Sequence, residues 1–313
     1  MTNEQITFLV FGIVIIVALA LDLGLLSKKT TTVSLQKALL QTGLWVSLAL
    51  LFFGFLWFEN GHVLAVEYLS AYLMEWSLSI DNIFVFILIF SFFAIKEKYY
   101  ARALLIGILM AIVLRIFFIS IGIQLVERFN WLLYVFGAII LYTGIKMFAA
   151  KAGEDEDLSE NRIYKLLLRF LPITQDEAGG KFTVVKDGKR YYTNMFVVIV
   201  MLATTDIIFA LDSIPAVFAI SQRPLVIYTS NIFAVLGLRS LFFLLRGAVN
   251  KFSYLQQGIA IVLIFIGLKM LAEIFHITVP IYISLLVILV CILASILYSI
   301  NRAKEVEDEK EAS

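Results

Sequence analysis

The sequence predicts an all-α, polytopic membrane protein of about nine transmembrane helices, built on an inverted repeat of three-helix units. Composition is the first reason: 61% of the 313 residues are hydrophobic and 16% are charged, whereas a soluble domain is about half apolar and a quarter charged. The second is a series of nine apolar runs, each near the roughly 20 residues that a helix needs to cross a bilayer. The third is a set of short motifs that occurs twice along the chain.

The nine apolar runs are separated by polar segments, and we expect each run to form one membrane-spanning helix. The first run follows Glu4 rather than basic residues and lacks an Ala-x-Ala site, so we expect a span and not a cleaved signal peptide. Together the runs make residues 1–313 a single membrane domain. They fall at about 6–26, 42–58, 63–95, 101–124, 131–149, 194–221, 225–246, 255–275 and 280–300.

Lysine and arginine residues gather in alternate loops. They follow the first, third, fifth, seventh and ninth runs, whereas the other loops hold only Arg128 and Arg223. By the positive-inside rule, the N-terminus is expected outside and the C-terminus in the cytoplasm. The formal net charge of +1 gives no indication of a nucleic-acid partner.

Two polar segments lie outside the spans. Residues 151–193 are expected to form a cytoplasmic insert with an amphipathic helix around 163–170, where apolar residues recur at helical spacing between basic ones. Asp187-Gly188, between β-prone flanks, predicts a tight β-hairpin in the same insert. The acidic tail, 302–313, is expected to be disordered.

Three landmarks recur in the same order and define two repeat units, 63–150 and 194–275. Each unit has a pair of carboxylates, then an arginine inside an apolar run, then a Gly-Ile-Lys-Met or Gly-Leu-Lys-Met sequence at 144–147 or 267–270. The second unit starts three spans after the first, so the two units would have opposite orientations. Inverted repeats of this kind are the plan of many secondary transporters, which bind substrate near the midplane.

The two carboxylate pairs lie deep inside apolar runs. Glu75 and Asp81 lie in the run 63–95, and Asp206 and Asp212 lie in the run 194–221 with the same spacing. A carboxylate at the bilayer centre costs roughly 2.5–3.5 kcal/mol on insertion scales. Four of them in matched positions predict an ion site, for which the alternative is a buried ion pair that ties helices together.

The spacing within each pair raises a question of geometry. Residues six apart lie about 240° around an ideal helix, so either the two carboxylates serve different clusters or the helix is broken between them. We expect breaks, because the run 63–95 would be about 50 Å long as one helix and the bilayer core is about 30 Å thick. Pro215 marks the expected helix break in the second motif, since it frees the carbonyl of Leu211 beside Asp212.

Oxygen atoms dominate the predicted ligand set. Asn82 and Ser213, which follow the second acid of each pair, add an amide and a hydroxyl oxygen to the four carboxylates. Such sites suit manganese, magnesium or calcium. Zinc and copper favour histidine and cysteine, and the chain has only two histidines and one cysteine. The residues leave the choice among the three ions open, and no tightly bound cofactor is expected.

Each of the other polar residues inside the spans has two possible roles. Asp22, near the inner end of the first run, is either paired or part of a gate, and Asn231 is either a ligand or a helix-to-helix hydrogen bond. Four basic residues either balance the charge of the site or extend toward the membrane surface from a span end. They are Arg115, Arg239, Lys146 and Lys269.

Three stretches resemble the TerC family, and within it the Alx-type branch. They are Glu-x5-Asp-Asn-Ile-Phe-Val-Phe at 75–86, Asp-Ile-Ile-Phe-Ala-Leu-Asp-Ser-Ile-Pro-Ala-Val-Phe-Ala at 206–219 and Thr-Ser-Asn-Ile-Phe-Ala-Val-Leu-Gly-Leu-Arg at 229–239. The resemblance implies a multi-pass protein of the bacterial inner membrane, associated with manganese export and historically with tellurite resistance. It maps the family's acidic residues onto the four motif carboxylates. Alx-type members commonly have a glutamate where this chain has Ala203.

The leading functional hypothesis is a secondary transporter that exports divalent manganese in exchange for protons, with the metal ion, protons and the lipid bilayer as its partners. No Gly-x4-Gly-Lys-Ser/Thr motif indicates direct use of ATP. The alternative is a membrane partner or metal-sensing protein that supports metallation of exported proteins, or tellurite resistance, without itself transporting. We do not expect an enzyme, because intramembrane aspartyl proteases carry Gly-x-Gly-Asp, whereas Asp81 and Asp212 follow Ser-Ile and Ala-Leu.

Overall fold

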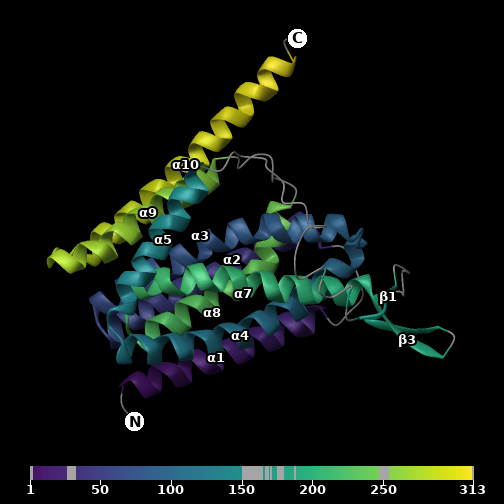
Figure 1. Ribbon diagram of the computed structural model, residues 1–313, viewed down its shortest axis with the longest axis horizontal. Coiled ribbons are helices and arrows are strands. Elements are labelled where there is room, and N and C mark those ends of the chain that lie inside the picture. Colours follow the sequence, from purple (N-terminus) through teal and green to yellow (C-terminus); the bar gives the residue numbers. More distant parts are fainter. Residues whose placement is uncertain are drawn as a thin grey trace.

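The structure is a computed structural model that describes residues 3–26, 33–149, 165, 169, 171–174, 180–186, 188–246 and 254–311. Its helices are α1 (Asn3–Leu26), α2 (Leu35–Glu59), α3 (His62–Phe92), α4 (Tyr100–Arg128), α5 (Leu132–Ala149), α7 (Asn194–Ile220), α8 (Pro224–Leu245), α9 (Leu255–Ala272) and α10 (Ile281–Glu311). Two short 3₁₀ turns, η1 (Glu97–Tyr99) and η3 (Glu273–Phe275), lie between helices. The all-helical, polytopic prediction is confirmed (Figure 1).

Eight helices in the described part of the chain are long and apolar enough to cross a membrane, namely α2 to α5 and α7 to α10. The predicted run 6–26 falls in α1, whose apolar part is the shorter stretch Gln5–Ala20. α1 lies at the edge of the bundle, where it contacts α2 and α8 (Figure 1). The predicted count of nine spans therefore stays a prediction.

α8 is the centre of the bundle. Nearly all of its residues are buried, and it packs against α2, α3 and α4. Pro224 stands at its first turn, where a missing amide hydrogen costs nothing. Small residues such as Ser230, Ala234 and Gly237 let the neighbouring helices approach closely, as is typical of helices that pack inside membranes.

α5 and α9 cross at very close range, and glycines make this contact. A Cβ atom at Gly144 would lie 2.8 Å from the backbone nitrogen of Ile264, and a Cβ at Gly267 would lie 2.7 Å from that of Leu141. Both glycines belong to the repeated Gly-x-Lys-Met landmark. α7 and α10 also pack against this pair.

The helix breaks that we expected are absent. α3 is continuous from His62 to Phe92, and α7 is continuous from Asn194 to Ile220 with Pro215 inside it. Pro215 lies in the second-to-last turn of α7, so its ring removes only one hydrogen bond near the end of the helix. Tight packing of α3 against α8, and of α7 against α3, α4 and α5, keeps the backbone helical on either side of the carboxylates.

A small sheet precedes α7. Strands β1 (Ile173–Thr174), β3 (Lys189–Thr193) and β2 (Thr183–Lys186) lie side by side in that order, with β2 antiparallel and β1 parallel to β3. Gly188, at a φ of 71°, turns the chain between β2 and β3 where the hairpin was expected. Arg102 donates a hydrogen bond to the carbonyl of Gly180 at 3.3 Å, which ties the sheet to the start of α4.

Two further predictions concern the polar segments. The amphipathic helix predicted around 163–170 lies outside the described residues. The tail expected to be disordered from 302 instead continues α10 to Glu311, and its end projects away from the bundle (Figure 1). Alanine, lysine and glutamate are strong helix formers, so the tail extends a helix that the apolar span has already nucleated.

Candidate functional site

The side chain of Arg115 joins four helices inside the bundle. Its Nε donates to Asp206 Oδ2 at 2.9 Å, and its Nη2 donates to Asp206 Oδ1 at 3.0 Å. Its Nη1 donates to Glu75 Oε1 and to Asn231 Oδ1, the latter at 2.8 Å. We call Glu75, Arg115, Asp206 and Asn231 the Arg115 cluster.

The Arg115 cluster is buried and lies in the middle of the bundle. Glu75, Arg115 and Asp206 lie near the centres of α3, α4 and α7, and each is at most 2% exposed. The paired hydrogen bonds between the guanidinium and Asp206 are the strong, geometrically specific form of this interaction. The cluster therefore connects α3 and α7, the two helices that carry the acidic motifs.

The charges of the cluster do not balance. Two carboxylates face one guanidinium, which leaves one negative charge in a region from which water is excluded. An uncompensated buried charge costs several kcal/mol. The cluster therefore favours a further cation or a proton.

Several buried oxygen atoms close to the motifs have no hydrogen-bond partner among the described residues. They are Glu75 Oε2, Ser79 Oγ and Ser213 Oγ. Buried polar atoms are nearly always paired, so unpaired oxygens mark a place where another atom is accommodated. Ser79 lies one turn after Glu75 on α3, on the same face of the helix.

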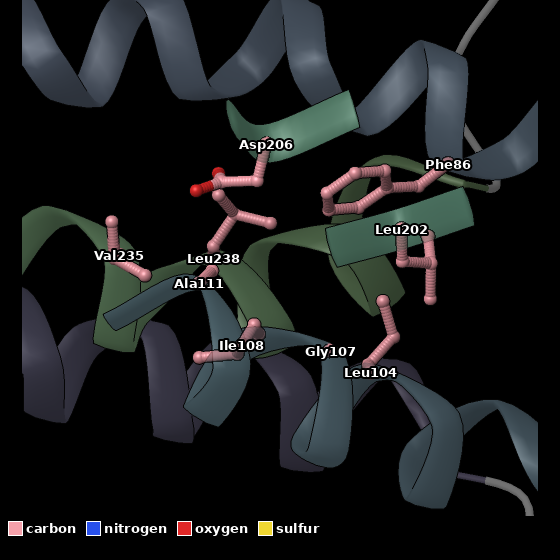
Figure 2. Close-up of a pocket in the computed structure, with 9 residues that line it drawn as sticks. All are labelled: Phe86, Leu104, Gly107, Ile108, Ala111, Leu202, Asp206, Val235 and Leu238. Carbon is pink, nitrogen blue, oxygen red and sulfur yellow. The ribbon is translucent and has the colours of Figure 1, made fainter. Parts of the chain in front are cut away.

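A cavity of about 10 Å³ lies beside Asp206 (Figure 2). Its other lining residues are apolar and come from α3, α4, α7 and α8, among them Phe86, Leu202 and Leu238. A space of this size holds about one water molecule. The surroundings of Asp206 on this side are apolar, which strengthens the electrostatic interactions within the cluster.

The predicted site residues fall into four groups. Glu75, Arg115, Asp206 and Asn231 meet in the cluster, while Asn82, Ser213 and Arg239 are buried in α3, α7 and α8. Lys146 and Lys269 lie outside it: Lys146 is exposed on α5, and Lys269 donates to Ala219 O and Ser284 Oγ, both at 3.2 Å. The side chains of Asp22, Asp81 and Asp212 lie outside the part of the chain that the structure describes.

No group of three or more histidine, cysteine, aspartate or glutamate side chains that would hold a metal ion occurs among the described residues. The side chains of Asp81 and Asp212 lie outside those residues. Ala203 is buried, and the hydroxyls of the following Thr204 and Thr205 donate to the carbonyls of Val200 and Met201 in their own helix. These hydroxyls are therefore committed to the backbone of α7.

The sequence reasoning missed one polar region. Glu67, Ser221 and Arg223 are connected at the end of the bundle where α3 begins and α7 ends, with Ser221 Oγ 2.7 Å from Glu67 Oε2. The available signal was Glu67 itself, a carboxylate inside the apolar run 63–95 and eight residues before Glu75.

Comparison with known proteins shows which family the chain belongs to. The profile of the integral membrane protein TerC family matches residues 60–307. The chain belongs to the TerC family. This membership covers α3 to α10, and hence every residue of the Arg115 cluster.

Relatives in the family match over most of their length. An uncharacterised membrane protein of Myxococcus xanthus is 43% identical over 290 residues, which cover 93% of this chain and 90% of the relative. An uncharacterised membrane protein of Rickettsia felis is 40% identical over 301 residues, covering 96% and 99%. A protein of Salmonella typhi, named as a proposed membrane-bound redox modulator, Alx, is 41% identical over 286 residues and 88% of each chain. No solved structure matches the chain.

Proposed function

We propose that this TerC-family chain is a secondary transporter of the bacterial inner membrane that exports divalent manganese in exchange for protons. The observation that carries the proposal is the Arg115 cluster, in which a carboxylate from each motif meets one guanidinium in the middle of the bundle. The metal is cargo in this proposal and not a resident cofactor.

The excess negative charge of the cluster is the physical basis for ion binding. Arg115 holds Glu75 and Asp206 when no metal is present, so that two carboxylates are not left bare in a region without water. A divalent cation brings twice the charge of the guanidinium and competes with it for the same oxygens. When the ion leaves, protons and Arg115 restore the balance.

The nature of the unpaired atoms supports a hard cation. The oxygens of Glu75, Ser79 and Ser213 that have no partner among the described residues are the ligand type that manganese, magnesium and calcium prefer. Asp81, Asp212 and Asn82, on the same two helices, are the further proposed ligands. The choice of manganese among these ions rests on the likeness to the TerC family.

The contact between α5 and α9 supports an inverted repeat. Gly144 lies against Ile264, and the matching Gly267 lies against Leu141. Since 267 corresponds to 144 and 264 to 141, the two contacts are reciprocal, with the chain direction reversed. A two-fold axis between antiparallel units produces this relationship, which favours a midplane site between the units.

Transport by purified protein in liposomes tests the proposal. The liposomes enclose a manganese-sensitive fluorophore, and a pH gradient is imposed across the membrane. We expect manganese flux that follows the gradient, loss of flux in Asp206→Asn, and retained flux in Glu59→Gln, which removes an exposed carboxylate at the end of α2. Absence of flux in the unmodified chain would exclude transport, and flux that persists unchanged without the gradient would exclude obligatory proton coupling.

A role as a membrane partner or metal sensor is the alternative. The name of the Salmonella relative favours a redox function for that protein, but the 313 residues here contain one cysteine, Cys291, and so cannot form an internal disulfide. In Asp81→Asn and Asp212→Asn, intact liposome flux with a lost cellular phenotype would support the partner role. Loss of both would support transport.

A further inference from the structure

A second, larger cavity of about 360 Å³ lies at one end of the bundle. The segments around it are the starts of α3, α5 and α10, the ends of α7 and α9, and the loop before α8. All of them lie at the end that the distribution of basic residues predicts to be outside. We call this cavity the outer chamber; its polar lining includes Glu67, Ser221, Gln222, Arg223, Lys269 and Glu273.

The outer chamber lies on the path that the two motif helices define. Glu67 precedes Glu75 by eight residues of continuous helix, which is about 12 Å along α3. Ser221 follows Asp212 by nine residues, which is about 14 Å along α7. Both helices therefore lead from the motif carboxylates to this one cavity.

Glu67 is held loosely at the wall of the chamber. Ser221 Oγ donates to Glu67 Oε2 at 2.7 Å, and Arg223 Nε lies 3.6 Å from the same oxygen. The Arg223 side chain is 51% exposed, and an exposed ion pair contributes at most about 1 kcal/mol. A divalent cation can displace Arg223 from Glu67 at little cost.

Lys269 brings a positive charge to the wall of the chamber, and the two acids of the lining, Glu67 and Glu273, offset it. Its ammonium donates to the carbonyl of Ala219, one of the last four of α7, and to Ser284 Oγ. The carbonyls at a helix C-terminus lack partners within the helix and carry a partial negative charge. Lys269 thus closes the end of α7 and fixes it against α9 and α10.

We propose that the outer chamber is the mouth through which the ion leaves, and that Glu67 binds the hydrated divalent cation there. The proposal rests on the proposed function for the direction of transport. A cation with six waters occupies about 180 Å³ at about 30 Å³ per water, so the chamber accommodates it with its water shell. The cation and its water shell then need to separate only along the path between Glu67 and the Arg115 cluster.

Labelling of a single cysteine tests the position of the chamber and its cation. Cys291→Ala removes the one native thiol, and Gln222→Cys then places a thiol at the chamber wall. We expect a membrane-impermeant maleimide to label Gln222→Cys in whole cells, and MnCl₂ to slow this labelling several-fold. Lys98→Cys, exposed at the opposite end, is the control and should be labelled only in inside-out vesicles.

A second variant tests whether Glu67 is responsible for the protection of Gln222→Cys by MnCl₂. In Glu67→Gln we expect the MnCl₂ concentration that protects Gln222→Cys to rise roughly tenfold, the loss that one charged interaction causes. Glu59→Gln, an exposed acid at the same end, should leave it unchanged. Labelling of Gln222→Cys only from the inside, no protection by MnCl₂, or equal protection in Glu67→Gln would overturn the proposal.

The outcome is distinguishable from failure of the proposed function. The labelling experiment requires no transport, so protection through Glu67 combined with absent liposome flux would retain the chamber as a cation site and reject export. Flux combined with absent protection would retain export and reject the chamber as its mouth.

Discussion

Arg115 makes hydrogen bonds to three side chains on three other helices, and its removal would leave two buried carboxylates facing each other. Breaking a buried ion pair by removing one partner costs about 3–5 kcal/mol. We therefore expect Arg115→Gln to lower the free energy of unfolding in detergent by that amount. Thermal or denaturant unfolding followed by circular dichroism measures it.

Two variants make the Arg115 prediction specific. Arg128→Gln removes an exposed arginine from the same helix and should change stability little. The double variant Arg115→Gln/Asp206→Asn should lose less stability than the sum of the losses in the two single variants. The reason is that each single change already removes the same interaction between Arg115 and Asp206. Equal free energies of unfolding in Arg115→Gln and Arg128→Gln would contradict the role of Arg115 in holding the buried carboxylates.

Ser213 has a buried hydroxyl without a partner among the described residues. Burying an unpaired hydroxyl is unfavourable, so Ser213→Ala should leave stability unchanged or raise it by up to about 1 kcal/mol. If Ser213 is a ligand of the transported ion, the same change should raise the manganese concentration at half-maximal flux. Thr42→Val on α2, which removes another unpaired buried hydroxyl, should affect neither flux nor affinity.

At the scale of single residues, the sequence singled out the charged side chains inside the spans but did not predict which of them would pair. Glu75, Asp206 and Arg115 were predicted from their cost in lipid, because each is a charged residue deep in an apolar run. Their meeting joins positions 91 and 40 residues apart along the chain. Such contacts depend on how the helices rotate about their axes when they pack, which no local pattern specifies.

Among the secondary-structure elements, the crossing of α5 and α9 depends most on residue size. A Cβ at Gly144 or Gly267 would fall within 2.8 Å of a backbone nitrogen, so the helices must separate to admit it. We expect Gly144→Ala and Gly267→Ala each to cost about 1–3 kcal/mol of stability. Gly54→Ala on α2, where nothing lies within 4 Å, should be neutral or stabilising by up to about 1 kcal/mol.

The α5–α9 prediction is checked by unfolding in detergent micelles. A decrease in Gly144→Ala that is no larger than in Gly54→Ala would show that the crossing tolerates a methyl group. Comparable losses in Gly144→Ala and Gly267→Ala would agree with the reciprocal contact, because the two positions occupy equivalent places in it.

Pro215 is the second feature at the scale of an element. It leaves α7 continuous but removes one backbone hydrogen bond near Asp212. We expect Pro215→Ala to restore that bond and stabilise the protein by up to about 3 kcal/mol, and to slow manganese flux if the helix must bend during transport. A stabilised variant with unchanged flux would show that this bending is not required.

At the scale of the whole molecule, the charges of the spans suggest a stoichiometry. The four motif carboxylates carry four negative charges, and Arg115 and Arg239 carry two positive ones, which leaves two negative charges. One divalent ion or two protons neutralises this excess. We therefore expect exchange of one manganese ion for two protons, with no net movement of charge.

A potassium gradient with valinomycin tests this prediction in liposomes. Manganese flux under a fixed pH gradient should be the same at zero potential and at either sign of membrane potential. Flux that scales with the potential would show that charge moves with each cycle, and hence that a different number of protons is exchanged.

The sequence by itself was sufficient to predict an all-helical, polytopic membrane protein and to single out the charged residues inside its spans. Bilayer crossing requires apolar runs of about 20 residues whatever surrounds them, so helix positions can be predicted from one sequence. A charge inside such a run is costly in any arrangement, so Glu75, Asp206, Arg115 and Arg239 could be singled out in the same way.

Packing between distant segments decided the rest. Lys146 and Lys269 occupy matching places in the repeat, yet one is exposed and the other is buried against the end of α7. α3 and α7 remain unbroken because neighbouring helices support them, and the outer chamber exists only where parts of α3, α5, α7, α9 and α10 meet. These features depend on the relative positions of elements, since burial and pairing are properties of the space between helices.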